Sequence, residues 1–378
     1  MPRTVLLTLG RLPKGLDAAR SFARAGWRVI VAEPFAWHLA RVSRDVARSY
    51  RVAAPNADPA GYLRDMGAIV ARENVELIVP VSEEAMHVAA IAPDLPPGVR
   101  FFGMGQADLL ALHDKLGFAR IAAGWGLDVP ETWRGDTPEA AALAASHDVV
   151  VKPRFSCSGI GVRFLARGSA MPADRPPPAS LVQSWIRGPV CSTFSLAHAG
   201  RVQVTAVYRG TVMGGTVAVA FERIEAPLVE AWVEAFVGRA SWSGSISFDF
   251  VLDEAGRAFA IECNPRMTSG VHFVDPEDLA TAIADPAGMP RPRLRTGRLY
   301  QQFFPCLTET QGSLFRRGPF RRNLGYLLRS RDVTWSARDP LPLLTMPLTS
   351  WQILRQTMFQ GRSMGEAATA DIGWFGPV

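Results

Sequence analysis

The stretch from Ser245 to Arg266 reads SISFDFVLDEAGRAFAIECNPR and predicts two β-strands joined by a turn. Apolar side chains alternate with others from Ile246 to Val251, with the period of two that is typical of a strand. Asp253 to Gly256 has the composition of a turn, and Ala258 to Cys263 forms the returning strand. We therefore predict a β-hairpin here.

Three polar side chains of this hairpin have the chemistry of metal ligands. Glu262 and Asn264 are two residues apart and therefore point to the same face of their strand. If Asp249 pairs across from them, three oxygen ligands converge on one side of the hairpin. A small set of hard oxygen ligands suits magnesium that also binds phosphate oxygens. The same pattern fits a hairpin with polar residues on its solvent-facing side, so both interpretations stay open at this point.

Composition indicates an ordinary folded protein with more than one domain. The chain has 378 residues, of which 48% are hydrophobic and 20% charged, so it can form two or three cores. Forty-one Lys and Arg against 35 Asp and Glu give a net charge of +6. Without a signal pattern or an apolar run of about 20 residues, we expect a cytoplasmic protein that does not span a membrane. The four cysteines lack CxxC spacing and are expected to be reduced.

The first hundred residues predict a parallel sheet covered by helices. Thr4 to Leu9 and Arg28 to Glu33 are predicted strands, and Leu16 to Gly26 between them has helical spacing. A strand, a helix and a strand in this order imply parallel pairing. Open parallel sheets bind ligands beyond the carboxyl ends of their strands, so Arg11 and Glu83 are candidates for substrate contact. A helix-capping role for Glu83 fits equally well.

Two lysines and a loop of small residues precede the hairpin in the sequence. Lys115 follows Asp114 in a region of predicted helices, and Lys152 lies in the predicted strand Val149 to Pro153. The loop from Ser156 to Val162 reads SCSGIGV. Lysines supply point charges to phosphates, and glycine lets backbone N–H groups approach phosphate closely. Taken singly, Lys152 also fits a buried salt bridge, and the loop also fits an ordinary turn.

A further pattern, LVQSWIRG from Leu181 to Gly188, reads as a strand that ends in a turn. Together with Asp114-Lys115, Gly126-Leu127-Asp128-Val129-Pro130, Lys152 and Glu262-Cys263-Asn264-Pro265-Arg266, it resembles the ATP-grasp superfamily of ligases. The resemblance covers about residues 1–290 and is of the carbamoyl-phosphate-synthetase-like or carboxylate–amine ligase type.

This resemblance implies an α/β fold with three parts. The first is an N-terminal parallel α/β domain at residues 1–108. The second is an α+β ATP-grasp domain at residues 109–290, with a mobile lid subdomain at about residues 125–184. Residues 291–378 have no counterpart in the resemblance and are expected to form an irregular, basic C-terminal extension.

The resemblance also implies which residues bind ATP and a metal ion. The implied nucleotide contacts are Lys115, Lys152, Ser158, Gly159, Gly161, Gln183, Ser184, Trp185 and Ile186. The implied magnesium ligands, which also suit manganese, are Asp249, Glu262 and Asn264. Arg266 is expected to stabilise charge on the transferring phosphoryl group. Ser184 and Val190 depart from the glutamates that are common at these positions in the family, which leaves the ribose contact open.

Arg223 is a second catalytic candidate, because an arginine near a strand end can clamp a phosphate or a carboxylate. A solvated arginine is the competing interpretation. The region from Arg291 to Arg331 holds ten arginines and one acidic residue, and it fits an anionic surface or an acidic carrier protein. For the apolar stretch from Leu341 to Phe359 we prefer packing on the body of the protein to contact with a membrane surface.

The leading functional hypothesis is an ADP-forming ligase that uses ATP and magnesium. It would activate a small carboxylate as an acyl phosphate and couple it to an amine or a thiol. A carbamoyl-phosphate or carboxylase-like reaction is an alternative within the same superfamily, and a non-catalytic nucleotide-binding scaffold or sensor is an alternative of another class. A homodimer is compatible with each of them. The sequence does not name the carboxylate or the nucleophile.

Overall fold

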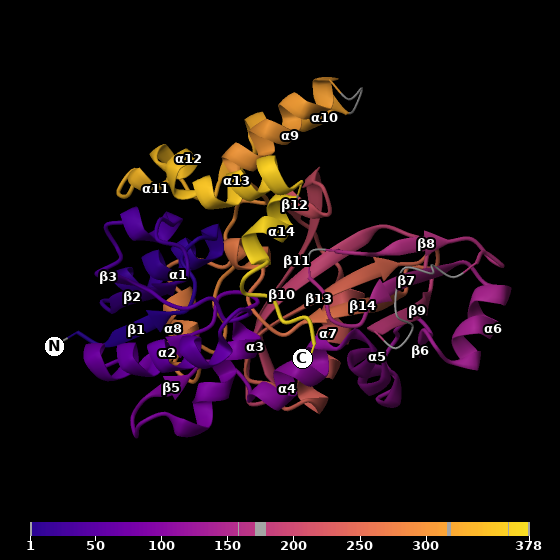
Figure 1. Ribbon diagram of the computed structural model, residues 1–378, viewed down its shortest axis with the longest axis horizontal. Helices are drawn as coiled ribbons and strands as arrows, with labels where there is room; N and C mark the ends of the chain where they lie inside the picture. The colour runs from indigo at the N-terminus through magenta and orange to yellow at the C-terminus, as the bar shows by residue number, and fades with distance from the viewer. Residues whose placement is uncertain (1, 158, 171–178, 316–318, 362, 377–378) are drawn as a thin grey trace.

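The computed structural model describes residues 2–157, 159–170, 179–315, 319–361 and 363–376. Three β-sheets with flanking helices build the fold, and a group of helices follows at the C-terminal end (Figure 1). The N-terminal sheet and the smallest sheet lie toward opposite ends of the long axis, with the largest sheet between them. The predicted α/β class, with a parallel N-terminal sheet and antiparallel sheets after it, is confirmed.

The N-terminal sheet is parallel and has the strand order β3-β2-β1-β4-β5. Its strands are β1 (Thr4–Leu7), β2 (Arg28–Glu33), β3 (Arg48–Arg51), β4 (Leu77–Val79) and β5 (Arg100–Phe101). Its helices are α1 (Pro13–Arg24), α2 (Pro59–Glu73), α3 (Ala85–Val88) and the 3-10 helices η1 (Leu39–Val42) and η2 (Ala89–Asp94). Val5 packs in the core that includes α1, whereas Leu6 packs in the core that includes α2. Both faces of the sheet are therefore covered, which explains why its central strands are apolar throughout.

Two helices connect this sheet to the rest of the chain, α4 (Gln106–His113) and α5 (Lys115–Gly124). Asp114 lies between them in an extended conformation, and its carboxylate accepts a hydrogen bond from the backbone N–H of Leu116. It is the N-cap of α5, because it satisfies one of the unpaired donors of the first turn. Lys115 is consequently the first residue of a helix instead of lying within one, and its side chain has a fixed direction.

A four-stranded antiparallel sheet follows, in the order β6-β9-β7-β8. Its strands are β6 (Thr132–Arg134), β7 (Val149–Pro153), β8 (Arg163–Leu165) and β9 (Ser180–Ser184). The helix α6 (Pro138–Ser146) covers one face, where Leu143 packs with Val149 and Val182. This sheet occupies the sequence range in which the lid is expected.

The largest sheet has seven strands in the order β14-β13-β10-β11-β12-β15-β16. They are β10 (Val190–His198), β11 (Arg201–Gly214), β12 (Val217–Arg223), β13 (Gly244–Leu252), β14 (Ala258–Asn264), β15 (Leu299–Gln301) and β16 (Arg331–Asp332). The helices α7 (Pro227–Arg239) and α8 (Leu279–Ala284) and the 3-10 helix η4 (Ser269–Phe273) belong to this part. Phe248 and Phe250 of β13 pack with Trp232 and Phe236 of α7, so one face of the predicted hairpin is buried. Its polar residues therefore project from the other face.

The C-terminal region is more helical than the irregular extension that the sequence predicts. Its helices are α9 (Phe303–Phe315), α10 (Phe320–Arg329), α11 (Leu341–Leu344), α12 (Met346–Thr349), α13 (Trp351–Gln360) and α14 (Met364–Thr369). The prolines that discourage a continuous helix lie instead at helix starts, as Pro342 and Pro347 do in α11 and α12. Proline fits the first helical turn because the backbone N–H that it lacks has no partner there.

Two further expectations concern the whole chain. No described helix is both long and apolar enough to cross a membrane. All four cysteines, Cys157, Cys191, Cys263 and Cys306, are buried free thiols, as predicted.

Candidate active site

The hairpin β13–β14 places its polar residues side by side. Asp249 lies opposite Glu262, and Ser247 lies opposite Asn264, so Glu262 and Asn264 share one face with Asp249 across from them. The Nδ2 of Asn264 donates to Asp249 Oδ2 at 3.1 Å. Ser192 of β10 donates its hydroxyl to Asp249 Oδ1 at 2.6 Å. The structure therefore brings the three proposed metal ligands together.

The electrostatics of this group fit a bound cation. Burial and the neighbouring charge of Glu262 raise the pKa of Asp249 to about 6. Two carboxylates and an amide oxygen make up a set of hard oxygen donors, which suits magnesium or manganese. Among the described residues, no group of three or more His, Cys, Asp and Glu side chains is placed so that it could hold a metal ion by itself. A divalent cation here would therefore depend on Asn264 and on oxygens from a second molecule.

Both predicted lysines converge on the returning strand of this hairpin. Lys115 Nζ lies 3.3 Å from Glu262 Oε1 and donates to the carbonyl of Ser156 at 2.7 Å. Lys152 Nζ donates to the carbonyl of Ile261 at 2.8 Å. Both side chains are buried, and burial lowers the pKa of Lys152 to about 8. Two positive charges thus lie next to the carboxylates, supplied by α5 and by a strand of the four-stranded sheet.

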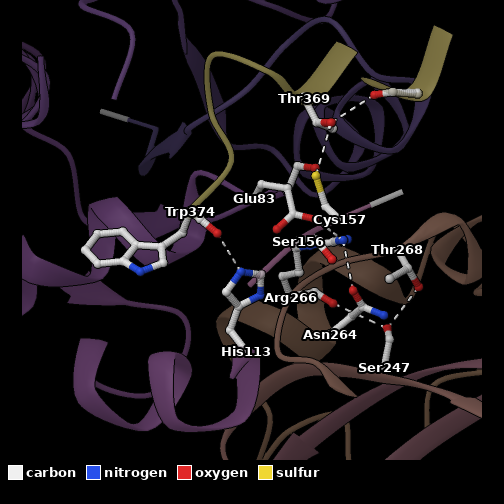
Figure 2. A network of polar contacts seen from close by, with 12 residues as sticks. Glu83, His113, Ser156, Cys157, Ser247, Asn264, Arg266, Thr268, Thr369 and Trp374 are labelled. Carbon is white, nitrogen blue, oxygen red and sulfur yellow. Dashed lines mark hydrogen bonds and ion pairs between the residues drawn. The ribbon is translucent and has the colours of Figure 1, made fainter. Parts of the chain in front are cut away.

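Arg266 connects the hairpin to the N-terminal domain, as Figure 2 shows. Its Nη2 donates to Glu83, which follows β4, and to Asn264 Oδ1 at 3.0 Å. Burial opposes the charge of Glu83, but the guanidinium of Arg266 holds the pKa of that carboxyl below its usual value. Glu83 thus contacts a site residue as well as lying at the strand end where the sequence places it.

The loop of small residues lies between the lysines and the C-terminal region. Gly159 and Gly161 have φ angles of +67° and +73°, a conformation that glycine adopts without strain. A Cβ at Gly159 would lie 3.0 Å from the Cβ of Thr216, so this position has little room for a side chain. Ser158 lies outside the described residues. The Sγ of Cys157 is 3.4 Å from the hydroxyl of Thr369 in α14 (Figure 2).

The predicted hinge strand lies in the middle of the four-stranded sheet. Gln183 is buried, and its Nε2 donates to the hydroxyl of Thr132 at 2.9 Å. The N–H groups of Ser184 and Trp185 already donate to Glu131 and Asp148 carbonyls. Among the hydrogen bonds described, none uses the N–H of Ile186, so Ile186 is the hinge position with a backbone donor available to a ligand.

Arg223 lies apart from this group. It ends β12, opposite Tyr208, and its Nη2 donates to the carbonyl of Arg295 at 3.4 Å. Arg223 is not among the described residues that line the cavity beside the hairpin β13–β14. The structure therefore does not bring it together with Arg266.

A cavity of about 540 Å³ opens beside the hairpin. Its polar wall includes Asp249, Glu262, Asn264 and Arg266. The opposite walls come from the N-terminal domain and from the C-terminal helices. The residues contributed by these two regions include Lys14, Ser82, Glu83, Met346, Ser350, Ile353, Thr357, Met364, Ala368 and Thr369. One space therefore adjoins the proposed metal ligands, the N-terminal loops and a C-terminal wall of both apolar and polar side chains.

Lys14 is a cavity residue that the sequence analysis does not select. Its Nζ donates to the hydroxyl of Ser82 at 2.9 Å and to the carbonyl of Met267 at 2.8 Å. Burial and the positive charge of Arg266 lower the pKa of Lys14 to about 7. The only sequence signal is its place soon after β1, which in the structure is the first turn of α1 at the carboxyl edge of the sheet.

The C-terminal tail after α14 crosses from the N-terminal domain to the first helices of the site. Asp371 accepts hydrogen bonds from Arg11, which also pairs with the buried Glu33. The carbonyl of Trp374 is 2.9 Å from the Nε2 of His113, at the end of α4 (Figure 2). The predicted extension therefore takes part in the structure around the cavity.

Comparison with known families gives one match for this region. Residues 112–270 match the family described as "ATP-grasp domain". A comparison with curated protein sequences finds no match. The matched range contains both lysines, the loop of small residues, the predicted hinge strand and the hairpin β13–β14.

Solved structures of similar fold extend the likeness beyond that range. One is the biotin carboxylase domain of Hydrogenobacter thermophilus 2-oxoglutarate carboxylase, which was solved with MgADP, ADP and bicarbonate. Its TM-score is 0.60 at 16% identity, and the alignment covers 79% of this chain and 72% of that one. L-amino acid ligase from Bacillus licheniformis has a TM-score of 0.57 at 18% identity, over 77% and 75%. N5-carboxyaminoimidazole synthetase from Staphylococcus aureus has a TM-score of 0.61 at 12% identity, over 84% and 88%. At these identities the likeness is one of fold.

Proposed function

Because residues 112–270 match the ATP-grasp domain family, we propose that this chain is an ATP- and magnesium-dependent ligase that forms ADP. In the proposed reaction, a carboxylate oxygen of the substrate attacks the γ-phosphorus of ATP, which gives an acyl phosphate and ADP. An amine or thiol then attacks the acyl carbon, and phosphate leaves. Small-molecule carboxylates and amines are accordingly the proposed substrates.

One observation supports this proposal most strongly. Lys115 and Lys152 come from different elements, and they contact Glu262 and the backbone carbonyl of Ile261, neighbouring residues on the hairpin that also carries Asp249. Buried positive charges next to paired carboxylates form a favourable place for a metal-bound triphosphate. The cavity beside them has room for a second substrate.

The proposed roles follow from these positions. Lys115, Lys152 and the loop with Gly159 and Gly161 would hold the phosphates, and Ile186 would donate its backbone N–H to adenine. Asp249, Glu262 and Asn264 would hold magnesium or manganese, which would neutralise charge on the phosphate oxygens. Arg266 would stabilise the transferring phosphoryl group. Arg223 stays a prediction from the sequence, because it is not among the described residues that line the cavity.

The experiment is ADP release from ATP and magnesium across a panel of carboxylates, each tested with amines and thiols. We expect one pair to give ADP and phosphate in equal amounts. Glu262→Gln should abolish turnover and leave the fold intact, because it removes the negative charge of one metal ligand and changes almost no volume. Glu254→Gln is the matched control, because Glu254 is exposed in the turn of the same hairpin. Full activity of Glu262→Gln would overturn the metal assignment.

A carboxylase-like reaction is the second candidate, and the likeness to biotin carboxylase structures favours it. ADP release that needs bicarbonate and no amine would support this alternative over the carboxylate–amine ligase. ATP binding without turnover on any pair would support a nucleotide-binding scaffold or sensor.

A further inference from the structure

Exposed apolar side chains concentrate in one part of this protein. Among the described residues, fifteen large apolar side chains are exposed, and nine of them lie between residues 314 and 359. These nine are Leu314, Leu328, Trp335, Leu341, Leu344, Leu348, Trp351, Met358 and Phe359. They belong to the helices α9 to α13 and their connections, which we call the C-terminal cover (residues 303–360). The preferred interpretation that Leu341 to Phe359 packs on the body therefore holds only for its inward side chains, such as Met346 and Ile353.

Exposed charge on the C-terminal cover is positive. Its sequence has eight arginines and three acidic residues, so it carries +5 of the chain's net charge of +6. Its described arginines are all exposed, namely Arg321, Arg322, Arg329, Arg331, Arg338 and Arg355. Its acidic residues Glu309, Asp332 and Asp339 are half-buried or buried. A negatively charged partner would therefore meet no exposed carboxylate of the described residues here.

The two faces of helix α13 have different surroundings, one being the cavity and the other the solvent. Ser350, just before it, and Ile353 and Thr357 within it line the cavity. Its exposed side chains are Trp351, Arg355, Met358 and Phe359. Residues three, four and seven positions apart share a face of a helix, so these two groups lie on opposite sides of α13. The outer face of α13 is therefore a surface of exposed apolar and cationic side chains, separate from the face that lines the cavity.

The position of the C-terminal cover leaves that surface accessible. Figure 1 shows α9 to α13 along one margin of the molecule, where α9 and α10 pack on β11 and β12. The most exposed apolar side chains there are Leu328, Leu348 and Phe359, at 76%, 73% and 74%. Side chains of this size cost free energy when water surrounds them, and their concentration on one group of helices is typical of an interaction surface.

We propose that the outer surface of the C-terminal cover binds an anionic lipid bilayer. Leucine, methionine and phenylalanine side chains would enter the boundary between headgroups and acyl chains, and the arginines would pair with the headgroups. Trp335 and Trp351 have the amphipathic ring that suits this boundary. A polynucleotide would leave Leu344 and Leu348 in water. A second copy of the chain would place arginines against arginines. An anionic lipid surface suits both the exposed apolar side chains and the positive charge.

The test is flotation of the full chain with vesicles at low ionic strength. We expect binding to vesicles of phosphatidylcholine mixed with phosphatidylglycerol, and none to phosphatidylcholine alone. The double variant Leu344→Ser, Leu348→Ser should bind about tenfold more weakly, because two apolar side chains no longer enter the boundary. Arg321→Gln and Arg322→Gln should each weaken binding about fivefold, and high salt should release the protein.

A matched control tests whether any exposed leucine has this effect. Leu228 of α7 is 62% exposed, close to the 66% of Leu344, and lies outside the C-terminal cover. Leu228→Ser should bind vesicles like the unchanged protein. Absence of binding to the mixed vesicles would overturn the proposal, and so would equal binding by the Leu344, Leu348 double variant. A dimer that this double variant abolishes, or tighter binding to a DNA duplex than to vesicles, would also overturn it.

Discussion

Arg266 is the residue at which the hairpin and the N-terminal domain meet. Its Nη2 donates to Glu83 and to Asn264, and its Nη1 donates to the carbonyl of Met267 at 3.3 Å, so two nitrogens of one planar group are used. A lysine has one nitrogen and cannot keep all of these contacts with the same geometry. The position therefore depends on arginine itself and not only on positive charge.

We predict that Arg266→Lys lowers kcat about 100-fold, within the range found when one group that stabilises transition-state charge is lost. The KM for ATP should change much less, because the lysines hold the phosphates. Arg257→Lys is the control, since Arg257 lies in the exposed turn of the same hairpin. Steady-state kinetics of both variants measure this effect. An unchanged kcat for Arg266→Lys would show that Arg266 does not stabilise the transferring phosphoryl group.

Lys14 gives a prediction about pH and stability. Its pKa is about 7 in the folded protein against 10.5 for an ordinary lysine, chiefly because it is buried. The unfolded chain therefore binds more protons between these values, and this residue makes the folded state more stable as pH rises through that window. Lys14→Met removes the effect. The stability of the unchanged protein relative to the variant should increase with pH, by at most about 1.4 kcal/mol per pH unit. Urea unfolding of both proteins measures this difference, and a constant offset across the window would contradict it.

At the scale of elements, the start of α5 directs a lysine toward the site. Asp114 caps α5 through the N–H of Leu116, and its carboxylate pairs with Arg154 after β7. Lys115 follows directly and lies beside Glu262. One aspartate thus fixes the helix start, a contact to the four-stranded sheet and the direction of a phosphate-binding candidate.

We predict that Asp114→Ala destabilises the protein by about 1–2 kcal/mol, the usual cost of losing an N-cap. It should also raise the KM for ATP, because Lys115 loses its fixed direction. Asp108→Ala is a suitable control, since Asp108 is an exposed acidic residue in the first turn of α4. Thermal unfolding and kinetics test the two parts separately, and an unchanged KM would show that Lys115 is held by other contacts.

The hairpin could be predicted from sequence because its signals are local. Strand alternation fixes which side chains of β13 face α7, and the turn at residues 253–256 fixes the pairing of Leu252 with Ala258. A register shift between Asp249 and Phe250, which the sequence does not predict, then places Asp249 opposite Glu262. The approach of Lys14 to Met267 could not be predicted in this way, since 253 positions separate them in the sequence. The same holds for the C-terminal wall of the cavity. Short helices that start at prolines lack the long apolar periodicity from which helices are recognised.

On the scale of the whole molecule, the tail after α14 joins the two ends of the chain. Arg11 is buried between Glu33 and Asp371, and both carboxylates contact its guanidinium. Because Arg11 keeps Glu33 if Asp371 is lost, the loss costs less than breaking an isolated buried pair. The tail still contributes to the folding of the N-terminal domain.

We predict that Asp371→Ala lowers the free energy of unfolding by about 2 kcal/mol, since it leaves part of a buried guanidinium without a partner. Asp94→Ala, an exposed position in the N-terminal domain, should leave stability unchanged. Urea unfolding compares the two variants. Equal stability of Asp371→Ala and the unchanged protein would show that the tail merely lies on the surface.

The central claim, activation of a carboxylate as an acyl phosphate, has a direct measurement. The carboxylate substrate found in the panel is labelled with ¹⁸O at both oxygens, and the phosphate released with magnesium, ATP and the nucleophile is examined by mass spectrometry. The oxygen that attacks the γ-phosphorus leaves with phosphate when the nucleophile attacks carbon, so each phosphate should carry one ¹⁸O atom. Phosphate that carries no label would contradict the claim, because water and not the carboxylate would then have attacked ATP.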